Sequence, residues 1–241
     1  MKTNVPVRTI VATLILLTAS LASAELVVSK AIVTFADPPN NREDIEVLNT
    51  SPDETLYVSV EGYEVVNPGT DQEKMVPIGQ SLRPEFVATP NKLAIGANGR
   101  SLVRLLNLNR VGETERIYRI NFLPIARPPE LVEPTEGEDV IQPALDIIIA
   151  YQVLAIVLPE NPAPEVSATR DGTSVLFTNE GSSNYLVSNG LQCNPELAAE
   201  CDELPSRRIY PGNQWRMELP YDGPFSYSIK THDGNFAKSF D

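Results

Sequence analysis

The stretch that decides the fold is Ala144–Leu158, which reads ALDIIIAYQVLAIVL. Every residue in it except Asp146 and Gln152 is apolar, and Pro143 and Pro159 stand on either side of it. The stretch is shorter than the roughly 20 apolar residues that a membrane-spanning helix needs. Isoleucine and valine dominate it, and β-branched side chains favour a pleated strand over a helix. The sequence therefore predicts one long strand.

Side chains alternate between the two faces of a strand, so each face of this one would be apolar. One face would carry Leu145, Ile147, Ile149, Tyr151 and Val153, and the other Ile148, Ala150, Leu154 and Ile156. Such a strand is either an ordinary core strand with both faces covered, or an apolar sheet edge that is kept for a partner. In the second case it would act by β-augmentation, in which main-chain hydrogen bonds give affinity and alternate side chains in pockets give specificity.

The first 24 residues have the features of a cleaved secretory signal. Lys2 and Arg8 supply its positive charge, Thr9–Leu21 its apolar core, and Ala22-Ser23-Ala24 a cleavage site of small residues. A membrane anchor is the alternative, but the short core and the well-formed site favour cleavage before Glu25. The remaining 217 residues are enough for one large β domain or two small ones.

The two cysteines, Cys193 and Cys201, are expected to form a disulfide, because secretion implies an oxidising compartment and their number is even. A redox pair or a metal site is the alternative. The spacing is not that of a C-x-x-C motif, and no histidine is near, so a structural bond is favoured.

Composition and motifs argue against several function classes. The net charge of −13 disfavours nucleic acid, whose binders neutralise phosphates. The single histidine, His232, lies in a predicted hairpin turn, where it is an unpromising general base. No zinc or calcium motif and no glycine-rich phosphate loop is present, so we expect no metal, no cofactor, no small-molecule substrate and no enzymatic activity.

The rest of the chain predicts an all-β protein with two domains. Short alternating segments with turn signals between them are typical of a β-sandwich. In the first domain they are Leu26–Phe35, Asp44–Asn49, Thr55–Val65, Leu82–Thr89, Ser101–Leu108 and Glu115–Ile125, with Val66–Gln80 as a hairpin loop. In the second they are Ser174–Thr178, Asn184–Ser188, Gln214–Leu219, Phe225–Lys230 and Asn235–Phe240.

With the long strand as the seventh, the first domain has the strand count of an immunoglobulin-like sandwich. A loop rich in proline and glutamate, between Pro124 and Pro143, leads into that strand. We therefore expect a signal peptide at 1–24, a first domain at 25–158, a proline-rich linker at 159–164, and a second, smaller β domain at 165–241.

The run Glu115–Ile125, ERIYRINFLPI, followed by a long loop and an alternating apolar strand, resembles the periplasmic pilus-assembly chaperones of the chaperone–usher pathway. The segment Ser101–Leu105, SLVRL, is similar to the penultimate hairpin of that family. The loop from Cys193 to Cys201 and the following Ile209–Gly212, IYPG, are similar to its divergent branch, the chaperones of alternative and α-type fimbriae. The resemblance covers nearly the whole chain after the signal.

The resemblance implies two immunoglobulin-like domains in an L, a periplasmic location, and pilin subunits and an outer-membrane usher as partners. Pilins lack their last strand, and the chaperone's seventh strand fills the groove, so the stretch from Leu145 to Val153 would bind the pilin. Leu145, Ile147 and Ile149 would occupy pockets of the pilin, followed on the same face by Tyr151 and Val153. A free chain could cover this edge by forming a homodimer.

The family also anchors the client's C-terminal carboxylate between the domains, with an arginine on the first strand and a lysine on the seventh. Lys30 matches the first position, although a solvated strand charge is the alternative for it. The second position falls near Leu154, which is not basic, so Arg119 on a neighbouring strand is expected to substitute. Two other functions stay open: a secreted β-sandwich module that binds carbohydrate or protein, and a hydrolase with paired carboxylates.

Overall fold

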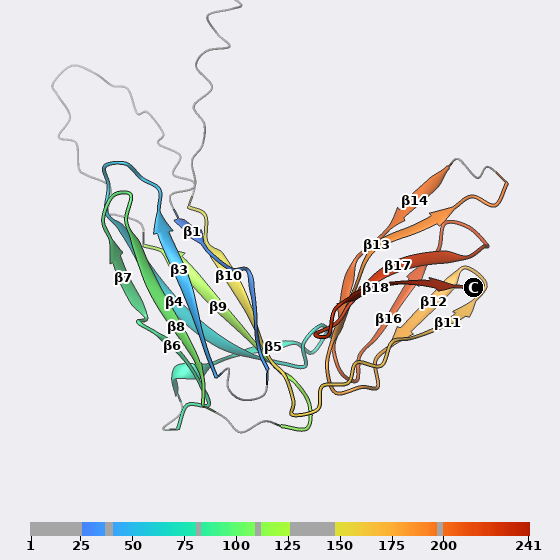
Figure 1. The fold of residues 1–241 in the computed structure, drawn as a ribbon, viewed down its shortest axis with the longest axis horizontal. Coiled ribbons are helices and arrows are strands. Elements are labelled where there is room, and N and C mark those ends of the chain that lie inside the picture. Colours follow the sequence, from blue (N-terminus) through green and yellow to red (C-terminus); the bar gives the residue numbers. More distant parts are fainter. Residues whose placement is uncertain (1–25, 37–40, 81–82, 109–111, 126–147, 197–199) are drawn as a thin grey trace, which may run out of the picture.

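The computed structural model consists of two β-sandwiches that meet at an elbow (Figure 1). It describes residues 26–241 except 37–40, 81–82, 109–111, 126–147 and 197–199. The predicted signal and most of the proline-rich loop before the apolar strand lie outside the described residues. In the described part there is no α-helix, and no helix is long and apolar enough to cross a membrane.

Two sheets form the first sandwich. One sheet has the strand order β1 (Leu26–Val28), β3 (Arg42–Asn49), β8 (Arg100–Asn107) and β6 (Phe86–Thr89). The other has the order β2 (Ile32–Phe35), β10 (Tyr151–Val157), β9 (Arg116–Pro124), β4 (Leu56–Val66) and β5 (Lys74–Pro77), and β7 (Lys92–Ile95) also pairs with β4. The pairing of β2 with β10 is parallel, and the other pairs are antiparallel.

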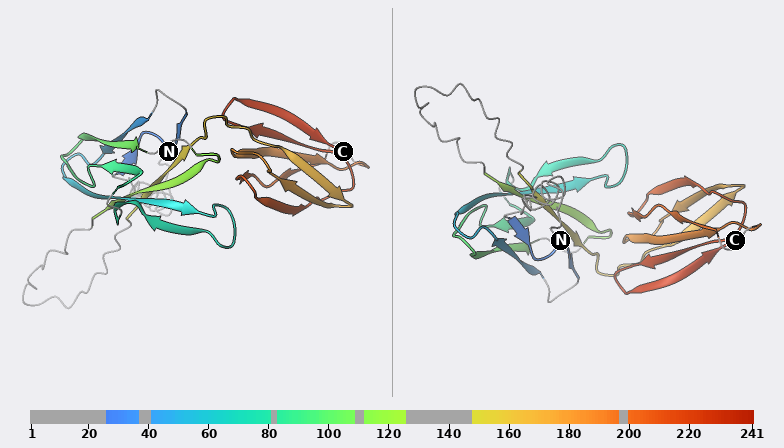
Figure 2. Two further views of the ribbon diagram at one scale, coloured as in Figure 1. Left: turned by 90° about the horizontal axis from the view of Figure 1, so that it is seen from below. Right: turned by 90° about the horizontal axis from the view of Figure 1, so that it is seen from above.

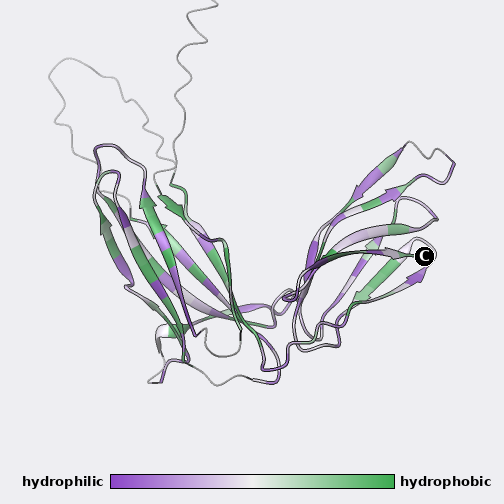
Figure 3. Ribbon diagram, in the orientation of Figure 1, coloured by the Kyte–Doolittle hydropathy of each residue, from purple (hydrophilic) through white to green (hydrophobic). Residues whose placement is uncertain are grey.

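The core of the first sandwich follows from the period-two pattern of its strands. Alternate residues of β9, such as Ile120 and Phe122, are fully buried between the sheets. Phe86 stacks on Tyr118 with ring centroids 4.2 Å apart and meets Phe35 edge-on at 5.4 Å. Figure 3 shows hydrophobic segments along the strands of both sandwiches, with more hydrophilic residues in many of the connecting turns.

The second sandwich has a separate core. Its smaller sheet has the order β11 (Ser167–Asp171), β12 (Ser174–Thr178) and β16 (Gln214–Glu218). The larger has the order β14 (Cys201–Leu204), β13 (Tyr185–Cys193), β17 (Phe225–Lys230) and β18 (Asn235–Phe240), with β15 (Arg207–Ile209) also on β13. Phe177 and Tyr227 lie at the centre of the core, with rings 5.7 Å apart. The all-β, two-domain prediction is confirmed.

The strand predictions need several corrections. Strands β7, β11, β14 and β15 were not predicted, and the other main differences lie in the first sandwich. The segment Leu26–Phe35 is two strands, because a break at Ser29–Ala31 moves the chain from one sheet to the other. The predicted loop Val66–Gln80 contains strand β5 and the short 3-10 helix η2 (Ile78–Gln80). The predicted long strand is, among the described residues, regular only from Tyr151 onward, and Ile148–Ala150 precede it without strand structure.

Candidate functional site

Strand β10 is fully paired on one side and only partly paired on the other. Its residues from Tyr151 to Val157 all pair with β9. Pairing with β2 begins only at Leu154, whose amide donates to the carbonyl of Ala31 at 2.9 Å. No described strand pairs with Tyr151–Val153 on that second side. The main chain of these residues is therefore an open sheet edge that ends at Leu154.

The burial of one face of β10 falls from Val153 back toward the start of the strand. Val157, Ala155 and Val153 are buried in the core of the first sandwich, and Tyr151 packs against that core. Ile149, the next residue on the same face, is 44% exposed. The apolar face thus continues beyond the point where its own sandwich can cover it.

The structure separates the residues that the sequence assigns to pilin binding. Leu145 and Ile147 lie outside the described residues. Ile149 is exposed and Tyr151 half-buried, whereas the side chain of Val153 is fully buried in the core of its own sandwich. The strand from Val153 onward is therefore a covered core strand, whereas Ile148–Gln152, the described residues before it, are partly or largely exposed.

The opposite face of β10 packs at the junction of the two sandwiches. Ile156 and Leu158 are buried together with Val65, Ile117 and Tyr210, and Leu154 packs partly against this cluster. Tyr210 belongs to the second sandwich, and the other members belong to the first or to the end of β10. Burial raises the pKa of the Tyr210 phenol. The end of the apolar strand is thus fixed against the second sandwich.

The two predicted anchor cations lie at different places. Lys30, in the turn between β1 and β2, forms an ion pair with Glu43 of β3 at 2.6 Å. Arg119 lies on the junction-facing side of β9, directly opposite Leu154, and forms an ion pair with Glu73 at 2.7 Å. No common partner joins the two cations in the described part of the chain.

The tip of the β4–β5 hairpin, residues 67–73, reaches across to the second sandwich, as both views in Figure 2 show. Asn213 donates from Nδ2 to the carbonyl of Pro68 at 2.6 Å, and Arg207 donates from Nη2 to the carbonyl of Gly69 at 3.2 Å. Gly69 has φ +74°, and a Cβ atom there would lie 3.0 Å from the ring of Tyr210. A glycine is needed at this close approach.

A buried carboxylate, which sequence reasoning missed, also joins the sandwiches. Oε2 of Glu115 accepts hydrogen bonds from the main-chain amide of Asn184 at 2.9 Å and from its side-chain Nδ2. Arg208 donates in turn to Oδ1 of Asn184. The other oxygen of Glu115 is buried and has no hydrogen-bond partner among the described residues. Burial is the main cause that raises the pKa of Glu115, opposed by the bonds from Asn184 and the charge of Arg208.

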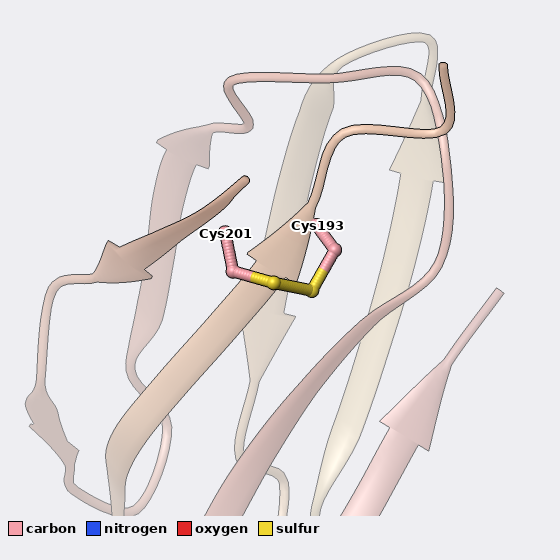
Figure 4. The surroundings of a disulfide bond; sticks show 2 residues. All are labelled: Cys193 and Cys201. Atoms are coloured by element: carbon pink, nitrogen blue, oxygen red, sulfur yellow. A yellow bond between two sulfur atoms is a disulfide. The ribbon is translucent and has the colours of Figure 1, made fainter. Parts of the chain in front are cut away.

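The two cysteines form the expected disulfide (Figure 4). Cys193 ends β13 and Cys201 begins the neighbouring β14, so the bond closes the hairpin between these strands. In the described residues, no group of three or more histidine, cysteine, aspartate or glutamate side chains could hold a metal ion. His232 pairs with the adjacent Asp233 in an exposed turn.

No protein-family model matches the chain. In sequence it is 26% identical over 200 residues to a CS1 fimbrial subunit of Escherichia coli, covering 81% of this chain and 82% of that protein. It is 24% identical over 206 residues to a CFA/I fimbrial subunit of Escherichia coli, covering 82% of this chain and 83% of that protein.

Among solved structures, the class 5 fimbriae chaperone CfaA matches with a TM-score of 0.61 at 18% identity, covering 89% of this chain and 98% of that one. The SafB chaperone, solved with the SafA pilin of Salmonella enterica, matches with a TM-score of 0.62 at 12% identity, covering 92% and 99%. The chain has the fold of the pilus-assembly chaperones. The match extends through both sandwiches, so the fold that the sequence resemblance implied is confirmed over nearly the whole described chain.

Proposed function

We propose that this chain is a periplasmic chaperone that binds pilin subunits by donor-strand complementation and delivers them to an outer-membrane usher. The observation that carries the proposal is the open edge of β10, with its apolar face continuing outward from the core. The pilus-chaperone fold and the fimbrial relatives from Escherichia coli support it. In this role the chain has no catalytic residues and needs no cofactor.

The edge gives the proposal a physical basis. An open edge presents unpaired main-chain groups, which a partner strand can satisfy. In this proposal a pilin strand pairs with Tyr151–Val153 and with the residues before them, and Ile149 and Tyr151 enter the pilin's core. Leu145 and Ile147 continue the same face. The side chain of Val153 stays in the chaperone's own core and fixes the strand from which the others project.

The chemistry of the junction supports Arg119 as an anchor for the client's carboxylate. A pilin strand that follows the open edge must end near Leu154, because β2 occupies the edge from there on. Arg119 lies opposite Leu154 on the next strand. Lys30 lies two residues before Ile32, the partner of Leu154 on β2, and is the second candidate cation. An arginine can hold a carboxylate through two parallel hydrogen bonds.

The proposal assigns residues 1–24 to a signal peptide, 25–158 to the strand-donating domain, 159–164 to a linker and 165–241 to the second domain. It also includes a homodimer as the state in which the free chaperone covers its edge.

The test is co-expression in the bacterial periplasm with a cognate pilin. We expect a one-to-one complex on gel filtration and protection of the pilin from proteolysis. Failure of the intact chain to protect the pilin would contradict the proposal. A chain that instead binds glycans in the absence of any pilin would favour a carbohydrate-binding module.

A further inference from the structure

Arg119 already holds a carboxylate in the free chain. Its guanidinium lies 2.7 Å from Oε1 of Glu73, and the two side chains are only 28% and 24% exposed. An exposed ion pair contributes little, because water and salt compete for both partners. This pair is largely shielded from water, so Glu73 is a real competitor for any other anion that approaches Arg119.

Glu73 is held in place independently of Arg119. Its other oxygen, Oε2, accepts a hydrogen bond from the amide of Gly69 at 2.8 Å. The carbonyl of Gly69 accepts from Arg207 of the second sandwich. The Glu73 carboxylate is therefore fixed on a hairpin tip that contacts the second sandwich. It can remain there while the Arg119 side chain turns to another partner.

Arg119 is also within reach of the place where a bound strand must stop. A strand that pairs with the open edge of β10 would lie two strand spacings, about 10 Å, from β9. Arg119 and Leu154 are directly paired across β9 and β10, and the open edge ends at Leu154. In the free chain the Arg119 guanidinium lies on the other side of β9, beside Glu73 and Met75. The terminal carboxylate of a chain that ends at Leu154 would lie within about 10 Å of β9, and the Arg119 side chain would turn across that strand to meet it.

We propose that Glu73 is an internal carboxylate that occupies Arg119 in the free chain and is displaced when the C-terminal carboxylate of a client arrives. This inference rests on the proposed function, because it needs a client strand that ends at Leu154. In this inference Glu73 sets the affinity of the chain for the client's C-terminal carboxylate. Glu73 occupies the anchor and repels a second anion, so only a carboxylate placed by a paired strand replaces it.

The experiment uses the full mature chain and a six-residue peptide of alternating threonine and valine, in two forms: one with a free C-terminal carboxylate and one amidated. Binding is followed by NMR through the arginine Nε–Hε signals, with Arg119→Lys to assign the signal of Arg119. We expect the acid peptide to shift that signal and to bind more tightly than the amide. Glu73→Gln should bind the acid peptide about three- to tenfold more tightly than the wild type, and the amide equally.

Asp71→Asn is the matched control, because it removes the same charge from the same hairpin tip without contact to Arg119. Its affinity for the acid peptide should stay within about twofold of the wild type. Glu73→Asp keeps the charge on a shorter side chain, and we expect it to fall between the wild type and Glu73→Gln. The amide signal of Gly69 checks that the hairpin keeps its place in each variant.

Equal or weaker binding of the acid peptide by Glu73→Gln would overturn the inference, because Glu73 would then support Arg119 instead of competing for it. An equal gain in affinity for the acid peptide in Asp71→Asn would also overturn the inference, because the loss of one negative charge anywhere on the hairpin tip would then explain the result. Equal binding of both peptides, or of neither, would remove Arg119 as a carboxylate site. Strand donation would stand apart from that result, because pilin protection tests it separately.

Discussion

The contrast between Ile149 and Val153 yields the sharpest prediction, because the two residues share one face of the same strand but differ in burial. Ile149 is 44% exposed, whereas Val153 is fully buried in the sandwich core. Full burial of an isoleucine side chain contributes roughly 1.5–3 kcal/mol. Covering the part of Ile149 that is exposed should therefore contribute about 1 kcal/mol to pilin binding, or roughly a fivefold change in Kd on truncation to alanine.

Ile149→Asp should be far more severe, because it places a carboxylate in the apolar groove of the client. An unpaired charge there costs several kcal/mol, so we expect pilin affinity to fall by at least about a hundredfold. The free energy of unfolding should change by less than about 0.5 kcal/mol, since Ile149 precedes the regular strand. Val153→Ala, in contrast, should cost about 2 kcal/mol of stability through the cavity that it leaves.

The assays are urea denaturation of each variant alone and titration of a cognate pilin into each folded chaperone. Loss of folding in Ile149→Asp would show that the residue belongs to the chain's own core. Unchanged pilin affinity in a folded Ile149→Asp would refute the reasoning directly.

Three further predictions concern other parts of the molecule. Because the pKa of Glu115 is raised by burial, the folded state binds its proton more tightly than the unfolded state, and that contribution to stability is lost as pH rises through the folded pKa. Glu115→Gln, which keeps an oxygen for Asn184, should therefore raise Tm at pH 7–8 but not near pH 4; an equal change at both would contradict this. Lys30→Ala should weaken pilin binding in calorimetric titrations at a nearly unchanged Tm, because its ion pair is exposed, and unchanged affinity would remove Lys30 from the site. Replacing Cys193 and Cys201 by serine should lower the free energy of unfolding by ~2–3 kcal/mol in urea titrations, and a change below ~0.5 kcal/mol would show that the bond does not constrain the unfolded chain.

The parts of the fold that could be predicted from sequence are those in which burial alternates along a strand. β12 and β17 have the predicted bounds, and β9 differs by one residue at each end. β18 also has its predicted bounds although it is mostly exposed, because it follows a predicted hairpin turn. β5 could not be predicted, because all four of its residues are exposed and only its pairing with β4 makes it a strand.

The apolar strand was recognisable from its composition, but its division into a covered half and an open half was not. That division depends on where β2 joins the sheet, and β2 begins after a break that leaves no strong signal in the sequence. The partners of Glu73 and Glu115 are tertiary contacts, which periodicity cannot indicate. Sequence alone does not distinguish a buried glutamate at the start of a strand, such as Glu115, from an exposed one.

The proposed function requires that the open edge of β10 pairs with a strand of another polypeptide. Hydrogen–deuterium exchange of residues 148–153, measured with and without a cognate pilin, tests this pairing. We expect alternate amides of this segment, whose partners the pilin strand supplies, to exchange at least tenfold more slowly in the complex. Unchanged exchange across this segment in a stable complex would show that the pilin binds elsewhere.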